Sequence, residues 1–258
     1  MTNFYMDDFL SGSHDVQGLR ELHSQMNGML KRGGFELAKW ATSNPKFATE
    51  LLDHGPREIQ QTQCGVLGMS WDPKSDKFFL KVEDYPFKQR EELTKRNLIS
   101  RISKIYDPTG FFTPILVSDK MIIQHLWTLG IHWDDVAPED VVEMWRQFHR
   151  SVIEIASISI PRWPAYSPSA DIQLHIFSDA SQSAYGSCAY LRSLSKGRDI
   201  CVRLITSRNK VSPIKTETIP RLELMGAVMA TELATYVQRA CRLQGIDVYY
   251  WTDSMIVL

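Results

Sequence analysis

The chain has 258 residues and a formal net charge of −1, so neither its size nor its overall charge indicates a nucleic-acid-binding protein. A hydrophobic content of 43% is sufficient for packed cores, and a charged content of 23% suits an exposed surface. No stretch is apolar over the roughly 20 residues that a membrane-spanning helix needs, and the N-terminus lacks the basic-then-apolar order of a secretory signal. The four cysteines form no CxxC pair and have no histidine partner at zinc-binding spacing. We therefore expect an intracellular, cytoplasmic protein with reduced thiols rather than a secreted one.

The first third of the chain combines short β-prone runs with one helix. Apolar residues at three- and four-residue steps predict this helix, which ends at Gly33-Gly34. An acidic pair between apolar residues predicts a tight hairpin before it, and Asp72 to Asp76 has the composition of a turn between two strands. The expected elements are a hairpin at 4–10, a helix at 15–31, a strand at 35–40, and strands at 65–71 and 77–82.

The middle of the chain has the periodicity of helices and is expected to form its own subdomain. Helices are predicted at 88–105, at 114–129 and from Ala137 onwards, with a turn at Asp107-Pro108-Thr109-Gly110 between the first two. The third helix has an apolar stripe that predicts its buried face, formed by Val141, Trp145, Phe148, Val152 and Ile155. Four tryptophans are more simply core residues than platforms for stacking bases: Trp127, Trp133, Trp145 and Trp163.

A proline-containing stretch at 160–170 is the best candidate for a linker. The pattern beyond it is three strands, a helix and a strand. The predicted ranges are 172–178, 184–191 and 200–207 for the first strands, 218–240 for the helix and 248–252 for the last strand.

Two stretches of the sequence are basic although the whole chain is not. Residues 88–104 contain six Lys or Arg and two Glu, and residues 192–215 contain seven Lys or Arg and one Asp. Such patches bind phosphates through counterion release. The alternative is a solvated basic face without a ligand.

The first acidic constellation is Tyr5-Met6-Asp7-Asp8, which places two adjacent carboxylates at a hairpin tip between apolar residues. Charges in such a setting need a positive partner. Magnesium is the candidate, because it takes hard oxygen ligands and keeps coordination positions for phosphates. The alternative is an exposed Asp-Asp pair in a polar turn.

The second constellation is dispersed along the chain. Asp179 ends one predicted strand, Asp253 ends another, and Glu223 lies in the first turns of the predicted helix. A single sheet edge can bring these together, and three carboxylates can hold two Mg²⁺ ions about 3.5–4 Å apart. Small residues beside the helix's apolar stripe allow close approach to the sheet: Gly226, Ala227, Ala230 and Ala234. The alternative is a helix-dipole glutamate with two strand-ending aspartates.

The YMDD sequence resembles the third catalytic motif of reverse transcriptases, and the order of the following elements matches that family. The Leu67-Gly68-Met69-Ser70-Trp71-Asp72 segment looks like the primer grip, which holds the growing DNA end. The resemblance implies a magnesium site at Asp7 and Asp8, completed by an aspartate from an earlier strand that this sequence does not contain. It also implies contacts with nucleic acid by Tyr5, Met6, Gly68 and Met69, joined by the basic residues Lys95, Arg96, Arg101, Arg208 and Lys210.

The C-terminal block resembles the ribonuclease H fold, in which the first and fourth strands are neighbours in a five-stranded mixed sheet. The resemblance implies that Asp179, Glu223 and Asp253 are catalytic metal ligands. A fourth acidic ligand, a further helix and a last strand follow in that family, and we expect them to be missing here. Other enzyme classes lack support, because the sequence has no GxSxG, GxxxxGK[ST] or GxGxxG motif.

Over most of its length the chain is similar to the BEL/Pao class of long-terminal-repeat retrotransposon polyproteins. The similarity rests on the Ile105–Phe111, His132–Asp135, Ile160–Trp163 and Thr218–Leu224 segments. It implies an α/β (α+β) fold in three parts, with the end of a reverse-transcriptase palm at 1–86, a helical thumb and connection at 87–165, and a truncated ribonuclease H-like domain at 166–258.

The expected function is RNA-directed DNA synthesis and Mg²⁺-dependent cleavage of RNA in RNA–DNA hybrids by the intact polyprotein, with Mn²⁺ as an alternative ion. We expect little or no activity from the chain alone. The implied partners are RNA–DNA hybrid, primer-template nucleic acid and other parts of the polyprotein, within a cytoplasmic virus-like particle and without a membrane. The alternative is a catalytically dead, element-derived protein that only binds nucleic acid.

Overall fold

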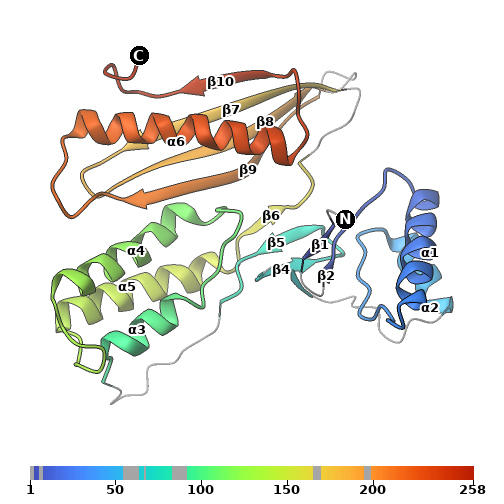
Figure 1. Ribbon diagram of the computed structural model, residues 1–258, viewed down its shortest axis with the longest axis horizontal. Helices are drawn as coiled ribbons and strands as arrows, with labels where there is room; N and C mark the ends of the chain where they lie inside the picture. The colour runs from blue at the N-terminus through green and yellow to red at the C-terminus, as the bar shows by residue number, and fades with distance from the viewer. Residues whose placement is uncertain are drawn as a thin grey trace. The chain divides into compact units, whose positions relative to one another are not determined.

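The computed structural model describes residues 3–5, 8–54, 64–66, 68–82, 92–164, 170–194 and 199–258 (Figure 1). These residues form two compact units. Unit 1 consists of Met1–Val66 and Ser70–Lys77, and unit 2 of Leu67–Met69 and Phe78–Leu258. Within the described ranges, no helix has both the length and the apolar character needed to cross a bilayer.

Unit 1 begins with the hairpin predicted at 4–10. β1 (Phe4–Tyr5) pairs antiparallel with β2 (Asp8–Phe9), and the rings of Phe4 and Phe9 lie 5.0 Å apart. The prediction is confirmed. Met6 and Asp7, which connect the two strands, lie outside the described residues.

Two helices follow in unit 1. α1 (Val16–Arg32) begins at Asp15, whose side chain accepts a 2.7 Å hydrogen bond from the Gly18 amide, and ends at Gly33, as predicted. α2 (Pro45–His54) was not predicted; Asn44 caps it by accepting a hydrogen bond from the Phe47 amide. The strand predicted at 35–40 is wrong. Positive φ angles at Gly34 (78°) and Lys39 (57°) break the extended backbone that a strand requires.

Three short strands cover the β-prone region. They are β3 (Cys64–Val66), β4 (Met69–Asp72) and β5 (Lys77–Phe79). The turn predicted between β4 and β5 is confirmed, because the Asp72 carboxylate accepts hydrogen bonds from the amides of Lys74 and Ser75. The run predicted as one strand at 65–71 is two strands, separated at Gly68, where φ is 84°.

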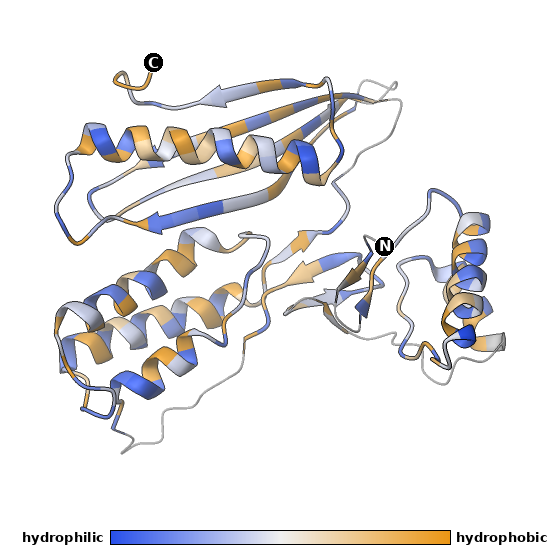
Figure 2. Cartoon of the chain, viewed as in Figure 1, coloured by the Kyte–Doolittle hydropathy of each residue, from blue (hydrophilic) through white to orange (hydrophobic). Residues whose placement is uncertain are grey.

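Unit 2 contains a helical block of α3 (Lys95–Ile102), α4 (Thr113–Thr128) and α5 (Glu139–Ile155), followed by β6 (Ser159–Pro161). The three predicted helices are confirmed, although α3 begins later than expected, at the Thr94 cap; residues 88–91 lie outside the described part. All five residues of the predicted α5 stripe are buried. The alternation of hydrophilic and hydrophobic residues along α4 and α5 is visible in Figure 2. Residues 165–169 of the predicted linker also lie outside the described residues.

The tryptophans of this block divide into two groups. Trp145 is 1% exposed and belongs to the core, as expected. The same expectation is wrong for Trp127, Trp133 and Trp163, which are 52%, 44% and 56% exposed. Trp127 and Trp133 pack edge to face with their ring centroids 5.6 Å apart, so each ring is shielded only in part.

The rest of unit 2 is a four-stranded sheet covered on one face by a long helix. The strands are β7 (Asp171–Ala180), β8 (Ala184–Leu194), β9 (Ile200–Val211) and β10 (Asp247–Trp251), in the order β10-β7-β8-β9. Only the β10–β7 pair is parallel. α6 (Ile219–Ala240) runs across one face of this sheet (Figure 1). The predicted elements and the adjacency of the first and fourth strands are confirmed, and the mixed α/β fold is ribonuclease H-like.

The core between α6 and the sheet follows from strand and helix periodicity. Every second residue of β7 and β8 faces α6, including Leu174, Ile176, Ala189 and Leu191, and all four are at most 2% exposed. The helix contributes Ala230, Leu233, Ala234 and Val237 to the same cluster. The small alanines allow the helix to lie close to the strands.

A seam of hydrogen bonds joins the helical block to β9. The Thr206 hydroxyl and the Ser207 amide both donate to the carbonyl of Thr109, at 2.7 Å and 3.2 Å. Gly110 lies at the closest approach: its φ is 73°, and a Cβ there would overlap the carbonyl oxygen of Ser207 and lie 2.8 Å from its carbonyl carbon. The predicted Asp107–Gly110 turn therefore packs directly against the sheet edge, and only glycine fits its last position.

Candidate active site

The register of the parallel strand pair brings two aspartates together. In β7 and β10, Phe177 lies opposite Trp251. Asp179 lies two residues after Phe177, and Asp253 lies two residues after Trp251. Because parallel strands run in the same direction, both carboxylates emerge at the same edge of the sheet.

The first turns of α6 bring the third carboxylate to this edge. Leu222 is fully buried and anchors the start of the helix, and Glu223 follows it directly. One turn further on, a Cβ at Gly226 would lie 3.4 Å from the carbonyl oxygen of Asp179. The helix therefore passes close to the end of β7 at this position, where a Cβ would be in ordinary van der Waals contact. Gly226 belongs to the small-residue flank predicted from the sequence.

Asp179, Glu223 and Asp253 each offer a carboxylate oxygen, and these oxygens lie within 4.8 Å of one another. No other group of three potential metal ligands is found among the residues that the structure describes. Loss of hydration raises the pKa of Glu223, and the negative charges of Asp179 and Asp253 raise it further. The structure thus gathers three like charges from three separate segments, an arrangement that a divalent cation would stabilise.

Another carboxylate of unit 2 has a raised pKa without a contribution from neighbouring like charges. Asp119 on α4 is 8% exposed, and burial raises its pKa to about 6. Its Oδ1 atom is buried without a hydrogen-bond partner within the described ranges. No second carboxylate contributes to this shift.

The N-terminal acidic pair is described only in part. Asp8 is exposed at the start of β2, where its backbone pairs with Tyr5. Asp7 and Met6, together with the side chain of Tyr5, lie outside the described residues. The roles of these four residues stay predictions.

The predicted primer-grip residues differ in their surroundings. Gly68 is exposed, and a Cβ at this position would overlap the ring of Tyr106. Met69 is only 2% exposed, and its sulfur accepts a 3.4 Å hydrogen bond from Thr109. The side chain of Met69 is therefore part of the core and is not available to touch nucleic acid.

The predicted basic residues of α3 are also not equivalent. Lys95 is 3% exposed, its ammonium donates to the carbonyl of Ile131, and it lies 4.0 Å from the centre of the Trp127 ring. This ammonium is enclosed by the protein and does not present its charge to a phosphate. Arg96 is exposed and forms a bidentate pair with Asp134. Arg101 lies in the last turn of α3 and is half-buried.

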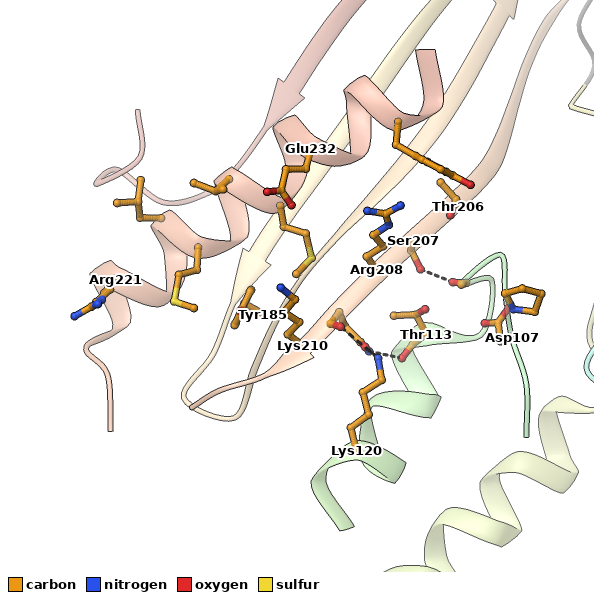
Figure 3. A pocket seen from close by; sticks show the side chains of 18 residues that line it. Asp107, Thr113, Lys120, Tyr185, Thr206, Ser207, Arg208, Lys210, Arg221 and Glu232 are labelled. Carbon is orange, nitrogen blue, oxygen red and sulfur yellow. Dashed lines mark hydrogen bonds between the residues drawn. The ribbon is translucent and has the colours of Figure 1, made fainter. Parts of the chain in front are cut away.

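Arg208 and Lys210 on β9 are exposed and line a groove of about 610 Å³ (Figure 3). The guanidinium of Arg208 lies 4.6 Å from the centre of the Tyr236 ring. Sequence reasoning missed Lys120 and Tyr236, which line the same groove. Nothing in the sequence signals their roles, because the contact between Lys120 and Asn209 joins residues 89 positions apart.

The strand order, the single parallel pair, and the cluster of two strand-end aspartates with a helix glutamate define an RNase H-like domain. A family model described as a Pao retrotransposon-like RNaseH-like domain matches residues 94–254, well over half of the chain. The chain belongs to this Pao retrotransposon family. An RNase H-like domain from a retrotransposon indicates a nucleic-acid-related function. No curated protein matches the chain.

Two solved structures of a foamy viral enzyme are similar to the chain. The protease-reverse transcriptase in complex with dsDNA shares 13% identity at a TM-score of 0.34, covering 76% of this chain and 38% of that chain. Its dRH form in complex with dsDNA shares 15% identity at a TM-score of 0.36, covering 80% and 35%. The chain thus spans little more than a third of either protein, and TM-scores this low support no argument about function.

Proposed function

We propose that unit 2 belongs to a metal-dependent nuclease that cleaves the RNA strand of RNA–DNA hybrids, with Asp179, Glu223 and Asp253 as the metal ligands. The observation that carries this proposal is the gathering of three carboxylates, from β7, α6 and β10, within 4.8 Å. The family assignment over residues 94–254 supports it.

The donor set fits a hard divalent cation. Magnesium binds oxygen ligands at about 2.0–2.1 Å, so two ligands of one ion are at most about 4.2 Å apart. A cluster spanning up to 4.8 Å would hold one ion after a small side-chain rotation, or two ions about 3.5–4 Å apart. Such ions activate a water and stabilise the leaving oxygen; the protein's part is to orient the carboxylates at the open edge of the sheet.

The test is cleavage of a labelled RNA–DNA hybrid by the chain and by a version extended beyond Leu258 along its coding sequence. We expect cutting in Mg²⁺ or Mn²⁺ and none in EDTA. Asp179→Asn should reduce the rate at least about 10³-fold, because it removes a carboxylate that holds the ions.

Asp247→Asn is the matched control, since Asp247 is an exposed aspartate at the other end of β10. It should cut like the wild type. The nuclease proposal is wrong if neither version cuts in either metal, or if Asp179→Asn and Asp247→Asn cut equally well.

A nucleic-acid-binding protein without catalysis is the second candidate, and the exposed cations Arg208 and Lys210 favour it. It predicts salt-dependent binding of the hybrid that is the same in the wild type and in Asp179→Asn. Binding without cutting by the extended version would select this candidate.

We also propose that the β1–β2 hairpin derives from a reverse-transcriptase palm, with Asp7 and Asp8 as magnesium ligands in the intact polyprotein. The pairing of β1 with β2 supports this, because Asp8, the described member of the acidic pair, begins the second strand of a tight hairpin. Primer extension by the intact polyprotein tests it: Asp7→Asn and Asp8→Asn should each abolish DNA synthesis, and normal synthesis by both variants would contradict it.

A further inference from the structure

The groove beside α6 is built by three elements of unit 2. β9 forms its floor, α6 one wall, and the Asp107–Gly110 turn with the start of α4 the other wall (Figure 3). Hydrogen bonds join the α4 wall to the floor: the Asn209 side-chain amide donates to the carbonyl of Thr113 at 3.0 Å, and the Lys120 ammonium donates to the carbonyl of Asn209. The floor and this wall are therefore directly connected.

The groove is lined by more positive than negative charge. Its cations are Lys120, Arg208, Lys210 and Arg221, and its acids are Asp107 and Glu232. The Asp107 carboxylate is already engaged, because it accepts hydrogen bonds from the amides of Phe111 and Phe112 at 3.1 Å and 2.7 Å. Arg221 pairs with Glu217 at 3.2 Å. The remaining cations, Arg208, Lys210 and Lys120, face a single open carboxylate, that of Glu232.

The geometry of Arg208 suits an anionic ligand. Its guanidinium lies over the Tyr236 ring, a contact that favours one position of this exposed cation along the groove. Leu224, Val228 and Tyr236 are each about half exposed along the α6 wall, at 56%, 49% and 52%. Cations beside an apolar wall match a sugar–phosphate backbone, which presents charge and apolar sugar edges together.

The groove and the carboxylate cluster lie on different flanks of the same helix. Arg221 and Leu224 line the groove, whereas Glu223, between them in sequence, belongs to the cluster. An α-helix with its side chains is about 10–12 Å wide. A nucleic acid held in the groove would therefore pass within one helix width of the carboxylates.

We propose that this groove binds the sugar–phosphate backbone of the RNA–DNA hybrid, so that the helical block, through Lys120, takes part in substrate binding. The inference rests on the proposed nuclease function. It adds a second contact surface at which charge, rather than metal, holds the substrate. Arg208 and Lys210 supply the phosphate contacts, and Tyr236 positions Arg208.

The test is fluorescence anisotropy with a labelled RNA–DNA hybrid and the full chain, in EDTA and at several salt concentrations. The double variant Arg208→Gln with Lys210→Gln should weaken binding at least about tenfold. It should also reduce the slope of log K against log salt by about 1 to 2, because each lost phosphate contact removes slightly less than one released counterion.

The matched control is Arg239→Gln with Arg242→Gln, which removes two exposed cations at the far end of α6. It should leave affinity and slope unchanged. Equal losses in both double variants, or an unchanged slope in the groove variant, would overturn the proposal. Lys210→Gln alone leaves the Arg208–Tyr236 contact in place and should reduce the slope by about half as much. This single variant tests the proposal if the double variant does not fold.

Cleavage assays separate the two proposals. Loss of cutting in Asp179→Asn with hybrid binding retained supports both. If the extended wild type never cuts but the groove variant still loses binding, the nuclease proposal fails alone. If cutting requires Asp179 while the groove variant binds and cuts like the wild type, the groove proposal fails alone.

Discussion

The described part of unit 2 contains two carboxylates whose pKa is raised; loss of hydration contributes at both, but neighbouring like charges contribute at only one. At the sheet edge, Glu223 is partly exposed and its pKa is raised by lost hydration and by the charges of Asp179 and Asp253. In the helical block, Asp119 is buried and its pKa is raised to about 6 by burial, against the opposing effect of Lys120. The first environment gathers three carboxylates at the surface, and the second buries a single carboxylate between packed helices.

The presence or absence of neighbouring carboxylates distinguishes a candidate metal site from a carboxylate that is merely buried by packing. A cation that reaches the sheet edge relieves the mutual repulsion of three carboxylates, so the cluster gains from a ligand. Asp119 is a single buried carboxylate, and its protonation removes the free-energy cost of burying a charge. A raised pKa therefore indicates a candidate site when neighbouring like charges contribute to it, and much less when burial alone does.

The largest expected difference between the two environments is in the rate of hybrid cleavage. Glu223→Gln should reduce hybrid cleavage by the extended chain at least about 10³-fold, equivalent to ~4 kcal/mol in the barrier, because it removes a metal ligand. Asp119→Asn should cut at the wild-type rate. Single-turnover cleavage in Mg²⁺ measures both variants. A folded Asp119→Asn variant that cut slowly would contradict the distinction between the two carboxylates.

The second effect is on stability and its pH dependence. The pKa of Asp119 is higher in the folded chain than its usual value near ~3.9, so the protonated form favours folding. This contribution is complete below about pH 4 and is lost as the pH rises through about 6.

The free energy of unfolding of Asp119→Asn, relative to the wild type, should therefore increase by up to ~3 kcal/mol between pH 4 and pH 7.5. Urea denaturation at both pH values measures it. Asp247→Asn serves as the control, since Asp247 is exposed at the start of β10. A difference between Asp119→Asn and wild type that is independent of pH would contradict the buried, raised carboxyl.

The third effect is ligand-dependent stability. Mg²⁺ at ten times its dissociation constant should stabilise the wild type by ~1.4 kcal/mol, which raises the melting temperature by a few degrees. Glu223→Gln should lose most of this increase and Asp119→Asn should keep it. Thermal melts with Mg²⁺ and with EDTA test the pair; equal Mg²⁺ responses in both variants would place the ion elsewhere.

The smallest effect concerns competition between protons and metal at the cluster. Because the pKa of Glu223 is raised, protons compete with Mg²⁺ at a higher pH than they would at an ordinary glutamate. The apparent affinity for Mg²⁺ should therefore fall as the pH is lowered. Calorimetric titration at several pH values measures this fall, which should be shallower in Glu223→Gln.

The sequence predicts unit 2 well because its periodic signals are long. The strands and α6 were predicted from alternating and three-to-four-residue patterns, and both strand-end aspartates follow from where those strands end. That β10 and β7 are neighbours is not visible in any local pattern. It came from the resemblance to the ribonuclease H fold, and the structure confirms it.

Features that depend on distant contacts could not be predicted in this way. The burial of Lys95 depends on Ile131 and Trp127, and the helical pattern around Lys95 gives no sign of either. α2 was missed because it is short, with only 10 residues. The seam joins Thr109 to residues 97 positions away, and no composition or periodicity predicts such a contact.

Gly110 has a consequence for how this polypeptide can vary. Its turn touches the backbone of β9, so any side chain there would have to displace either the turn or the strand. A change in β9 that moved the carbonyl of Ser207 away from the turn would allow a side chain at position 110. Conversely, a side chain at position 110 could be accommodated only if that carbonyl moved. Substitutions at position 110 and in the facing part of β9 are therefore coupled, because the backbone of Ser207 leaves no space for a side chain at position 110.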